Sequence, residues 1–215
     1  SIVSMILAIL VIQNKRAAIN WSFFALIVSV NIWSVGLAFA NIAPDAATCE
    51  IWRRFSAVGW GMIYSIILHF FCILTKRKTL LKKWWFYSLL YFPAVVTVLT
   101  FAFPSKLNPA PYKLINTEFG WINIANFNFW DWFFYAYYIA YLVIGLILVL
   151  QWGLKSQENR IKKQSRAIFL SFLIALIIAT ITDVVLGNFL AKLPQVAPIV
   201  LLIPIMTLYR IIKKY

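Results

Sequence analysis

The sequence predicts an all-α integral membrane protein, a seven-transmembrane helix bundle with its N-terminus outside the cytoplasm and its C-terminus inside. Composition is the first observation behind this prediction, because 63% of the 215 residues are hydrophobic and only 12% are charged. Soluble domains hold about 45–50% apolar and about 25% charged residues. The second observation is the series of long apolar stretches, and the third is the uneven distribution of Lys and Arg between them.

Seven apolar stretches account for the predicted helices, since a transmembrane helix needs roughly 20 apolar residues. They lie near residues 1–12, 19–42, 51–75, 84–103, 131–152, 167–189 and 194–212. The first stretch is too short to cross a bilayer and begins without Met or a basic flank, so we expect the natural chain to begin earlier. An amphipathic pattern continues through Ile211, Ile212 and Tyr215, so we expect cytoplasmic output domains beyond residues 1–215.

Basic residues gather in the connections on one side of the predicted bundle. Fifteen of the 20 Lys and Arg lie there, namely Lys15, Arg16, Lys76, Arg77, Lys78, Lys82, Lys83, Lys155, Arg160, Lys162, Lys163, Arg166, Arg210, Lys213 and Lys214. The other side holds Arg53, Arg54, Lys106, Lys113 and Lys192. Because a basic excess marks cytoplasmic loops, the first side is predicted to face the cytoplasm. The same rule explains the net charge of +14 without a nucleic acid partner.

The longest predicted connection runs from Pro104 to Trp130 on the outer side and is rich in aromatic residues. One interpretation is an interfacial belt, in which Trp and Tyr lie at the level of the lipid headgroups. The other is a lid over a cavity between helices, with Tyr112 and Trp121 as its candidate residues. The two interpretations are compatible.

Ionisable side chains at membrane depth are costly and usually face the bundle interior. From the helix rise, Asp183 lies about 9 Å inside the outer boundary, and Arg53 and Arg54 lie within about 5 Å of it. Tyr135 and Tyr138 lie at similar depth. This outer cluster is either an ion pair that joins two helices or a ligand site. The predicted ligand-binding residues are Arg53, Arg54, Asp183, Tyr135, Tyr138, Trp121 and Tyr112.

No pattern in the sequence predicts an enzyme site, a metal site or a cofactor. His69 lies nearer the cytoplasmic end and is predicted to be a packed, hydrogen-bonded structural residue. Cys49 and Cys72 lie roughly 34 Å apart along one predicted helix, so they cannot pair with each other. Two cysteines and one histidine are too few for a structural zinc site. No second carboxylate lies at the depth of Asp183 to form a catalytic dyad.

A series of short motifs runs through nearly all 215 residues in a fixed order. The motifs are Trp52-Arg53-Arg54 before Gly59-Trp60, His69-Phe70 before Leu74-Thr75, Leu90-Tyr91-Phe92-Pro93-Ala94, Phe119-Gly120-Trp121, Gln164-Ser165-Arg166, Asp183, and Tyr209-Arg210. In these features the chain resembles the N-terminal seven-transmembrane sensor region of bacterial histidine kinases. The resemblance implies the signal-input domain of a two-component sensor kinase, usually dimeric, in the bacterial cytoplasmic membrane. A diguanylate cyclase is a second possible output domain.

The predicted signal is a hydrophobic or amphipathic molecule, a lipid, or the membrane itself. Polar groups concentrate in the outer half of the bundle, which predicts a cavity open to the outside. Pro198 and Pro204 offer a hinge in the seventh helix, because proline removes a backbone donor. Occupancy of the cavity would then tilt the inner end of that helix. A small membrane transporter or a scaffold component is the alternative function, although the prolines show no repeat symmetry of the kind that transporters have.

Overall fold

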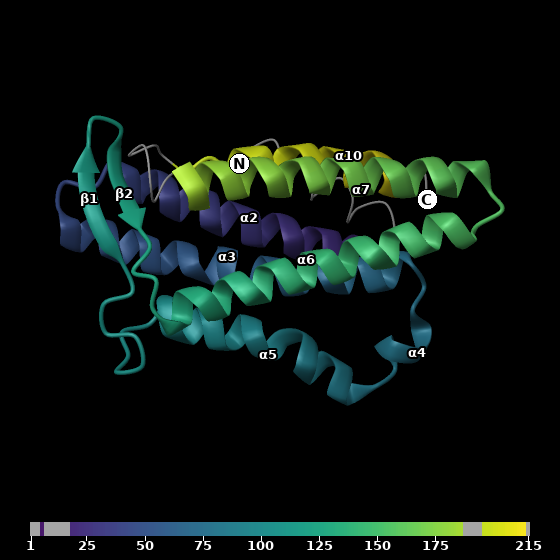
Figure 1. The fold of residues 1–215 in the computed structure, drawn as a ribbon, viewed down its shortest axis with the longest axis horizontal. Coiled ribbons are helices and arrows are strands. Elements are labelled where there is room, and N and C mark those ends of the chain that lie inside the picture. The colour runs from purple at the N-terminus through teal and green to yellow at the C-terminus, as the bar shows by residue number, and fades with distance from the viewer. Residues whose placement is uncertain (1–4, 7–17, 187–194, 214–215) are drawn as a thin grey trace.

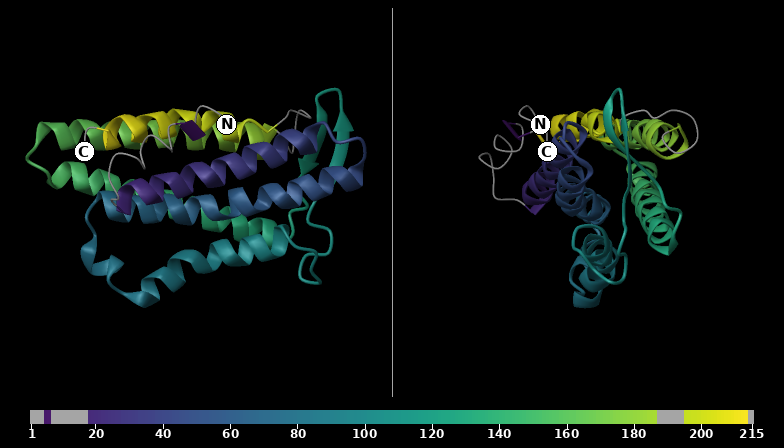
Figure 2. Two further views of the ribbon diagram at one scale, coloured as in Figure 1. Left: turned by 180° about the vertical axis from the view of Figure 1, so that it is seen from behind. Right: turned by 90° about the vertical axis from the view of Figure 1, so that its left-hand side faces the viewer.

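The computed structural model describes residues 5–6, 18–186 and 195–213. In chain order its elements are α2 (Ala18–Asn41), α3 (Ala46–Leu74), α4 (Lys78–Leu81), α5 (Trp84–Phe101), β1 (Lys113–Thr117), β2 (Gly120–Ile124), α6 (Phe129–Lys155), α7 (Asn159–Ala179), the π-helix η1 (Thr180–Leu186), α9 (Ala197–Val200) and α10 (Leu202–Ile212). The helices α2, α3, α6, α7 and α10 run along the longest axis of the molecule (Figure 1). The β-hairpin lies at one end of this bundle, and α4 lies at the other (Figures 1 and 2).

Five helices of the described chain are long and apolar enough to cross a membrane: α2, α3, α5, α6, and α7 extended by η1. The shorter apolar segment Ala197–Ile212 corresponds to the predicted stretch 194–212. The predicted stretch 1–12 lies outside the described residues except for Met5 and Ile6. Helices are therefore found at each predicted stretch that the structure describes.

The starts of α3 and α6 lie earlier than the hydrophobic stretches predict, because each helix begins at a polar cap. Asp45 caps α3 by accepting a hydrogen bond from the Thr48 backbone N–H at 2.7 Å, and this bond lowers the pKa of the Asp45 carboxyl. Asn128 caps α6 in a reciprocal capping box with Asp131. A polar cap satisfies backbone donors at the helix start but contributes nothing to hydrophobicity.

α2 and α3 pack against each other closely because small residues face the contact. A Cβ atom at Gly59 would collide with the Ser29 carbonyl and the backbone of Trp33. On α2, Gly36 lies directly against Ser56. Small residues let helix backbones approach in this way. The resulting van der Waals packing stabilises helix contacts in lipid, where the hydrophobic effect does not drive helices together.

α5 packs on α3 and α6 near the hairpin end and runs away from α6 toward α4 (Figures 1 and 2). Pro93 lies inside α5 and cannot donate to the Leu89 carbonyl. The Tyr141 hydroxyl of α6 donates to that carbonyl at 2.7 Å, so the freed backbone acceptor is satisfied across the helix contact.

The aromatic connection contains a two-stranded antiparallel hairpin, β1–β2, which the sequence interpretation does not include. The helical fold class applies to the bundle but not to this connection. Gly120 follows the turn with a φ of 94°, in the left-handed region that favours glycine, and it lies against the Asn41 carbonyl at the end of α2. The hairpin is therefore fixed onto the helix ends that it covers.

Candidate ligand cavity

A cavity of about 170 Å³ lies in the half of the bundle nearest the hairpin, between α3, α6 and α7 with η1. Its walls are mostly aromatic and aliphatic. The charged and amide side chains that line it are Arg53, Asp131, Asp183, Asn123 and Gln195. A mostly apolar pocket with a few polar groups is typical of small-molecule sites. An apolar cavity of roughly 150 Å³ can hold a benzene molecule, so this space suits a small ligand.

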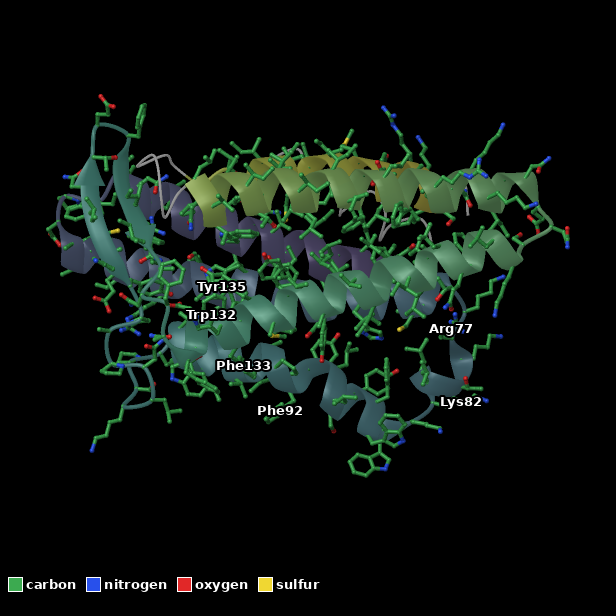
Figure 3. The ribbon with its side chains drawn as sticks, viewed as in Figure 1. Arg77, Lys82, Phe92, Trp132, Phe133 and Tyr135 are labelled. Carbon is green, nitrogen blue, oxygen red and sulfur yellow. The ribbon has the colours of Figure 1, made fainter. Side chains whose placement is uncertain are left out.

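Aromatic rings of α3 and α6 form one side of the cavity. The Phe134 ring lies 4.7 Å from the Trp60 ring, 5.9 Å from the Tyr64 ring and 5.6 Å from the Tyr138 ring, measured between centroids. On α6, Tyr135 lies on the side toward α7, while Phe133 lies on the opposite side (Figure 3). The predicted residues Tyr135 and Tyr138 therefore both line the cavity.

Arg53 of α3 lies at the hairpin side of the cavity, and only 4% of its surface is exposed. Its Nη2 atom donates to the Trp121 carbonyl at 2.9 Å, and its Nη1 atom donates to Gln195 Oε1 at 3.3 Å. Both acceptors are neutral. The guanidinium therefore joins α3 to the hairpin and to the segment that begins α9.

Asp183 belongs to the π-helix η1 and lines the same cavity. Its carboxylate accepts hydrogen bonds from the backbone N–H groups of Val196 at 3.0 Å and Ala197 at 3.1 Å, and from the Thr182 hydroxyl at 2.8 Å. The predicted ion pair of Asp183 with Arg53 or Arg54 is absent from the described residues. The depth of Asp183 along its helix does not show that backbone N–H groups at the start of α9 already donate to its carboxylate.

Arg54 does not line the cavity, although it neighbours Arg53 in the sequence. Its guanidinium pairs with the Glu50 carboxylate of the same helix, with Nη2 at 2.6 Å and Nε at 2.9 Å from Oε1. Successive residues on an α-helix point about 100° apart, which explains why the two arginines face different surroundings. The grouping of Arg54 with the cavity residues is therefore wrong.

The structure separates the two candidate lid residues. Tyr112 lines the cavity, and its hydroxyl donates to the Phe101 carbonyl at 2.9 Å; burial raises the pKa of this hydroxyl. Trp121 does not line the cavity. Its indole Nε1 donates to the Ala43 carbonyl at 2.8 Å, and its own carbonyl accepts from Arg53. Trp121 thus fastens the hairpin to the connection between α2 and α3.

Three charged or amide residues of the cavity, Asn123, Asp131 and Gln195, are not among the predicted site residues. Gln195 precedes α9 and contacts Arg53, but an isolated glutamine carries no pattern that predicts such a contact. Asp131 is not a predicted site residue, although Asn128 three residues earlier is the signal for a capping box at that position. Its carboxylate accepts a hydrogen bond from the Asn128 N–H at 3.2 Å and faces the cavity from the first turn of α6.

His69 lies outside the cavity lining. Its Nδ1 atom lies 2.8 Å from the Tyr91 hydroxyl of α5, and its ring packs edge-to-face with Tyr87 at 5.5 Å. These contacts agree with a structural, hydrogen-bonded histidine. Cys49 and Cys72 are both buried and unpaired. Among the described residues, no group of three metal-ligating side chains comes together.

Residues 1–213 match the family described as the N-terminal 7TM region of histidine kinase. The chain belongs to this family. The predicted resemblance is therefore confirmed, whereas a search of curated proteins finds no match. As the input region of a membrane-bound sensor, the segment has several apolar helices that cross the membrane. The cavity accordingly lies in a signal-input segment.

Proposed function

We propose that residues 1–215 sense a hydrophobic or amphipathic molecule in the outer cavity and relay its presence through the last helix to a cytoplasmic histidine kinase. In this proposal the full-length protein is a homodimer in the bacterial cytoplasmic membrane. A diguanylate cyclase output would leave the sensing step unchanged. The observation that carries the proposal is the position of Asp183, which faces the cavity and also binds the start of α9.

The relay rests on the construction of α9 and α10. Asp183 holds the backbone N–H groups of Val196 and Ala197, and the helix is interrupted at Leu201. Pro204 explains this interruption, because it has no N–H to donate to the Val200 carbonyl. A ligand that shifts η1 would therefore move the first turn of α9 and change the tilt of α10. Coupling requires that the ligand bind one tilt more tightly than the other.

The proposed orientation has seven spans with the N-terminus outside. The basic residues at the ends of α3, α5, α6, α7 and α10 all lie at the end of the bundle opposite the hairpin, where Arg77 and Lys82 are visible (Figure 3). A basic excess favours the cytoplasmic side. The hairpin and the cavity then lie on the outer side.

This orientation can be tested by labelling single cysteines on intact cells with a membrane-impermeant maleimide. Lys113 in the hairpin and Gln157 between α6 and α7 are both exposed. We expect Lys113→Cys to react and Gln157→Cys to stay unlabelled until the cells are lysed. The native cysteines are buried and give a low background. Labelling of Gln157→Cys alone on intact cells would contradict the orientation.

The sensing proposal can be tested by filling the cavity in the full-length protein. Ala175 of α7 lines the cavity and is 3% exposed, so Ala175→Phe places a ring in the ligand space. Ala136 of α6 is exposed on the outside of the bundle, so Ala136→Phe adds the same volume without entering the cavity. We expect Ala175→Phe to change autophosphorylation at least about fivefold, which is the low end of typical allosteric coupling.

The control variant Ala136→Phe is expected to keep wild-type autophosphorylation. Membrane insertion and thermal unfolding of both variants are measured first, so that a loss of fold is not mistaken for a loss of signalling. A folded Ala175→Phe protein with wild-type output would refute the proposal that this cavity controls the kinase.

A further inference from the structure

Arg53 carries a buried positive charge at the cavity wall with no negative partner. Its side chain donates to two neutral oxygens, the Trp121 carbonyl and Gln195 Oε1, and its Nε atom has no hydrogen-bond partner in the described part of the chain. A guanidinium has five N–H donors, of which these contacts use two. Arg53 lines the cavity and also interacts with the Cys49 side chain, and Nε is a donor that no described residue uses.

Burial of a charge is costly unless an opposite charge and hydrogen bonds compensate for it. Within the described residues no carboxylate lies within ion-pair distance of Arg53. The ionisable groups with the largest electrostatic effect on it are the Cys49 thiol and the Tyr112 hydroxyl, and both groups are ordinarily neutral at pH 7. The described residues therefore give this charge no negative partner.

The two carboxylates of the cavity do not meet this need, because each already accepts hydrogen bonds from the backbone. Asp131 accepts from the Asn128 N–H, and Asp183 accepts from the N–H groups of Val196 and Ala197. Backbone donors of this kind stabilise an ionised carboxylate without a cation. The cavity thus combines two carboxyl groups that already accept backbone hydrogen bonds with one guanidinium whose Nε donor has no partner among the described residues.

Arg54 shows that the same helix can supply a partner where a structural charge needs one. Its guanidinium is paired with Glu50 one turn earlier. Arg53 has Cys49 at the corresponding position, and a neutral thiol cannot act as an ion-pair partner. Arg54 therefore has a negative partner on its own helix, whereas Arg53 has none among the described residues.

We infer that Arg53 binds the anionic head group, such as a carboxylate, of a small amphiphile whose apolar body packs against the rings of Trp60, Phe134 and Tyr138. This inference rests on the proposed function and names the class of its ligand. Arginine suits a carboxylate because its donors form a planar fork. The cavity of about 170 Å³ admits a head group and a body about the size of one ring.

Three probes of nearly identical shape and different charge test the inference: 3-phenylpropanoate, 3-phenylpropanamide and 3-phenylpropylammonium. Binding of each probe to the purified full-length protein is measured by calorimetry in phosphatidylcholine nanodiscs. We expect the anion to bind at least about tenfold more tightly than the neutral amide, in line with the strength of hydrogen bonds to charged groups. The ammonium probe should bind most weakly.

Substitutions at adjacent positions assign this selectivity to one residue. Arg53→Gln should weaken binding of the anion roughly 10- to 100-fold and leave the amide within about threefold of wild type. Arg53→Lys keeps the charge and should retain a preference for the anion. The matched control, Arg54→Gln, should retain the full wild-type selectivity, because Arg54 lies outside the cavity lining.

Equal binding of the three probes to the wild-type protein would overturn the inference even if Arg53→Gln failed to fold. Selectivity that persists in folded Arg53→Gln would also overturn it. Selective binding together with unchanged kinase output in Ala175→Phe would instead refute the proposed function and keep the anion site, so the two failures are distinguishable.

The source of the amphiphile is tested by adding phosphatidylglycerol to the nanodiscs. If phosphatidylglycerol competes with 3-phenylpropanoate in the wild-type protein but not in Arg53→Gln, the inference is supported and the anionic head group belongs to a lipid of the bilayer. If phosphatidylglycerol leaves the affinity for 3-phenylpropanoate unchanged, the inference is supported and the ligand is a soluble amphiphile.

Discussion

The two halves of α3 differ in what surrounds their side chains. Toward the hairpin, Arg53, Trp60 and Tyr64 line a cavity. Toward the basic end, Phe70 and Phe71 are at most 1% exposed and fill the interior. One helix therefore lines a mostly apolar cavity along one half and contributes to a close-packed core along the other. The proposed binding site thus lies along the half of α3 nearest the hairpin, and the close packing lies along the other half.

Polar side chains follow the same division. In the outer half, Arg53 retains donors that no protein acceptor uses. In the inner half, two pairs of polar groups are bonded to each other: Ser65 Oγ lies 2.7 Å from the Tyr137 hydroxyl, and His69 is bonded to Tyr91. Satisfied polar pairs lend rigidity to the inner half, whereas the unused Arg53 donor belongs to a residue that lines the cavity.

The largest expected effect is a loss of stability caused by Phe71→Ala in the packed half of the bundle. Phe71 is fully buried, packs against Phe172 at 5.1 Å between ring centroids, and lies directly against Gly145. We expect a loss of about 3 kcal/mol in the free energy of unfolding. The loss lies at the low end for a buried phenylalanine because lipid tails also solvate the ring in the unfolded state.

Phe92→Ala is the matched control for this prediction. Phe92 is 64% exposed and points away from the bundle on α5 (Figure 3). Its loss should change the unfolding free energy by less than about 0.5 kcal/mol. Both variants are compared by thermal or denaturant unfolding in the same nanodiscs. Equal destabilisation by the two substitutions would mean that the inner half is not a specific core.

Hydrophobicity alone predicts the helices, because a membrane requires long apolar segments whose backbone bonds are internal. The predicted stretch 84–103 and the observed α5 begin at the same residue, Trp84. The positions of Arg53 and Asp183 in the wall of a cavity, rather than toward lipid, also follow from the cost of placing ionisable groups in lipid. These features depend on local composition, which the sequence displays directly.

Features that depend on contacts between distant segments could not be predicted. Gly120 of the hairpin lies against the Asn41 carbonyl, and the backbone N–H groups of Val196 and Ala197 donate to Asp183. The contrast between Arg53 and Arg54 arises from rotation about the helix and from which neighbour is acidic. A hydropathy pattern records neither tertiary hydrogen bonds nor the direction of a side chain.

The second prediction concerns the half of the bundle that contains the cavity and uses the variant Asp183→Asn. The amide keeps one carbonyl acceptor but loses the charge that strengthens the bonds to Val196 and Ala197. We expect a loss of about 1 kcal/mol in stability, typical of a weakened helix cap. Autophosphorylation of the full-length protein should change at least about fivefold. Wild-type output from a folded, inserted variant would remove Asp183 from the relay.

The smallest expected effect tests whether the paired polar groups of the inner half are purely structural. Tyr91→Phe removes the hydroxyl that bonds to His69 Nδ1 at 2.8 Å. The loss should be about 0.6 kcal/mol, an average value for side-chain hydrogen bonds between helices in membranes. Kinase output should be unchanged, because neither residue lines the cavity.

Tyr137→Phe calibrates this last measurement within the same half. The Tyr137 hydroxyl is buried and bonds both to the Ser65 hydroxyl and to the Ser65 backbone N–H, at 2.7 and 3.0 Å. Its removal takes away the bonds to Ser65 and to the Gly61 carbonyl, while Ser65 Oγ keeps its bond to the Leu90 carbonyl. Because several buried hydrogen bonds are lost, the cost should exceed that of Tyr91→Phe, at about 1–3 kcal/mol. A change in signalling from Tyr91→Phe comparable to that from Asp183→Asn would erase the distinction between the halves, because a residue remote from the cavity would then control output as strongly as one in its wall.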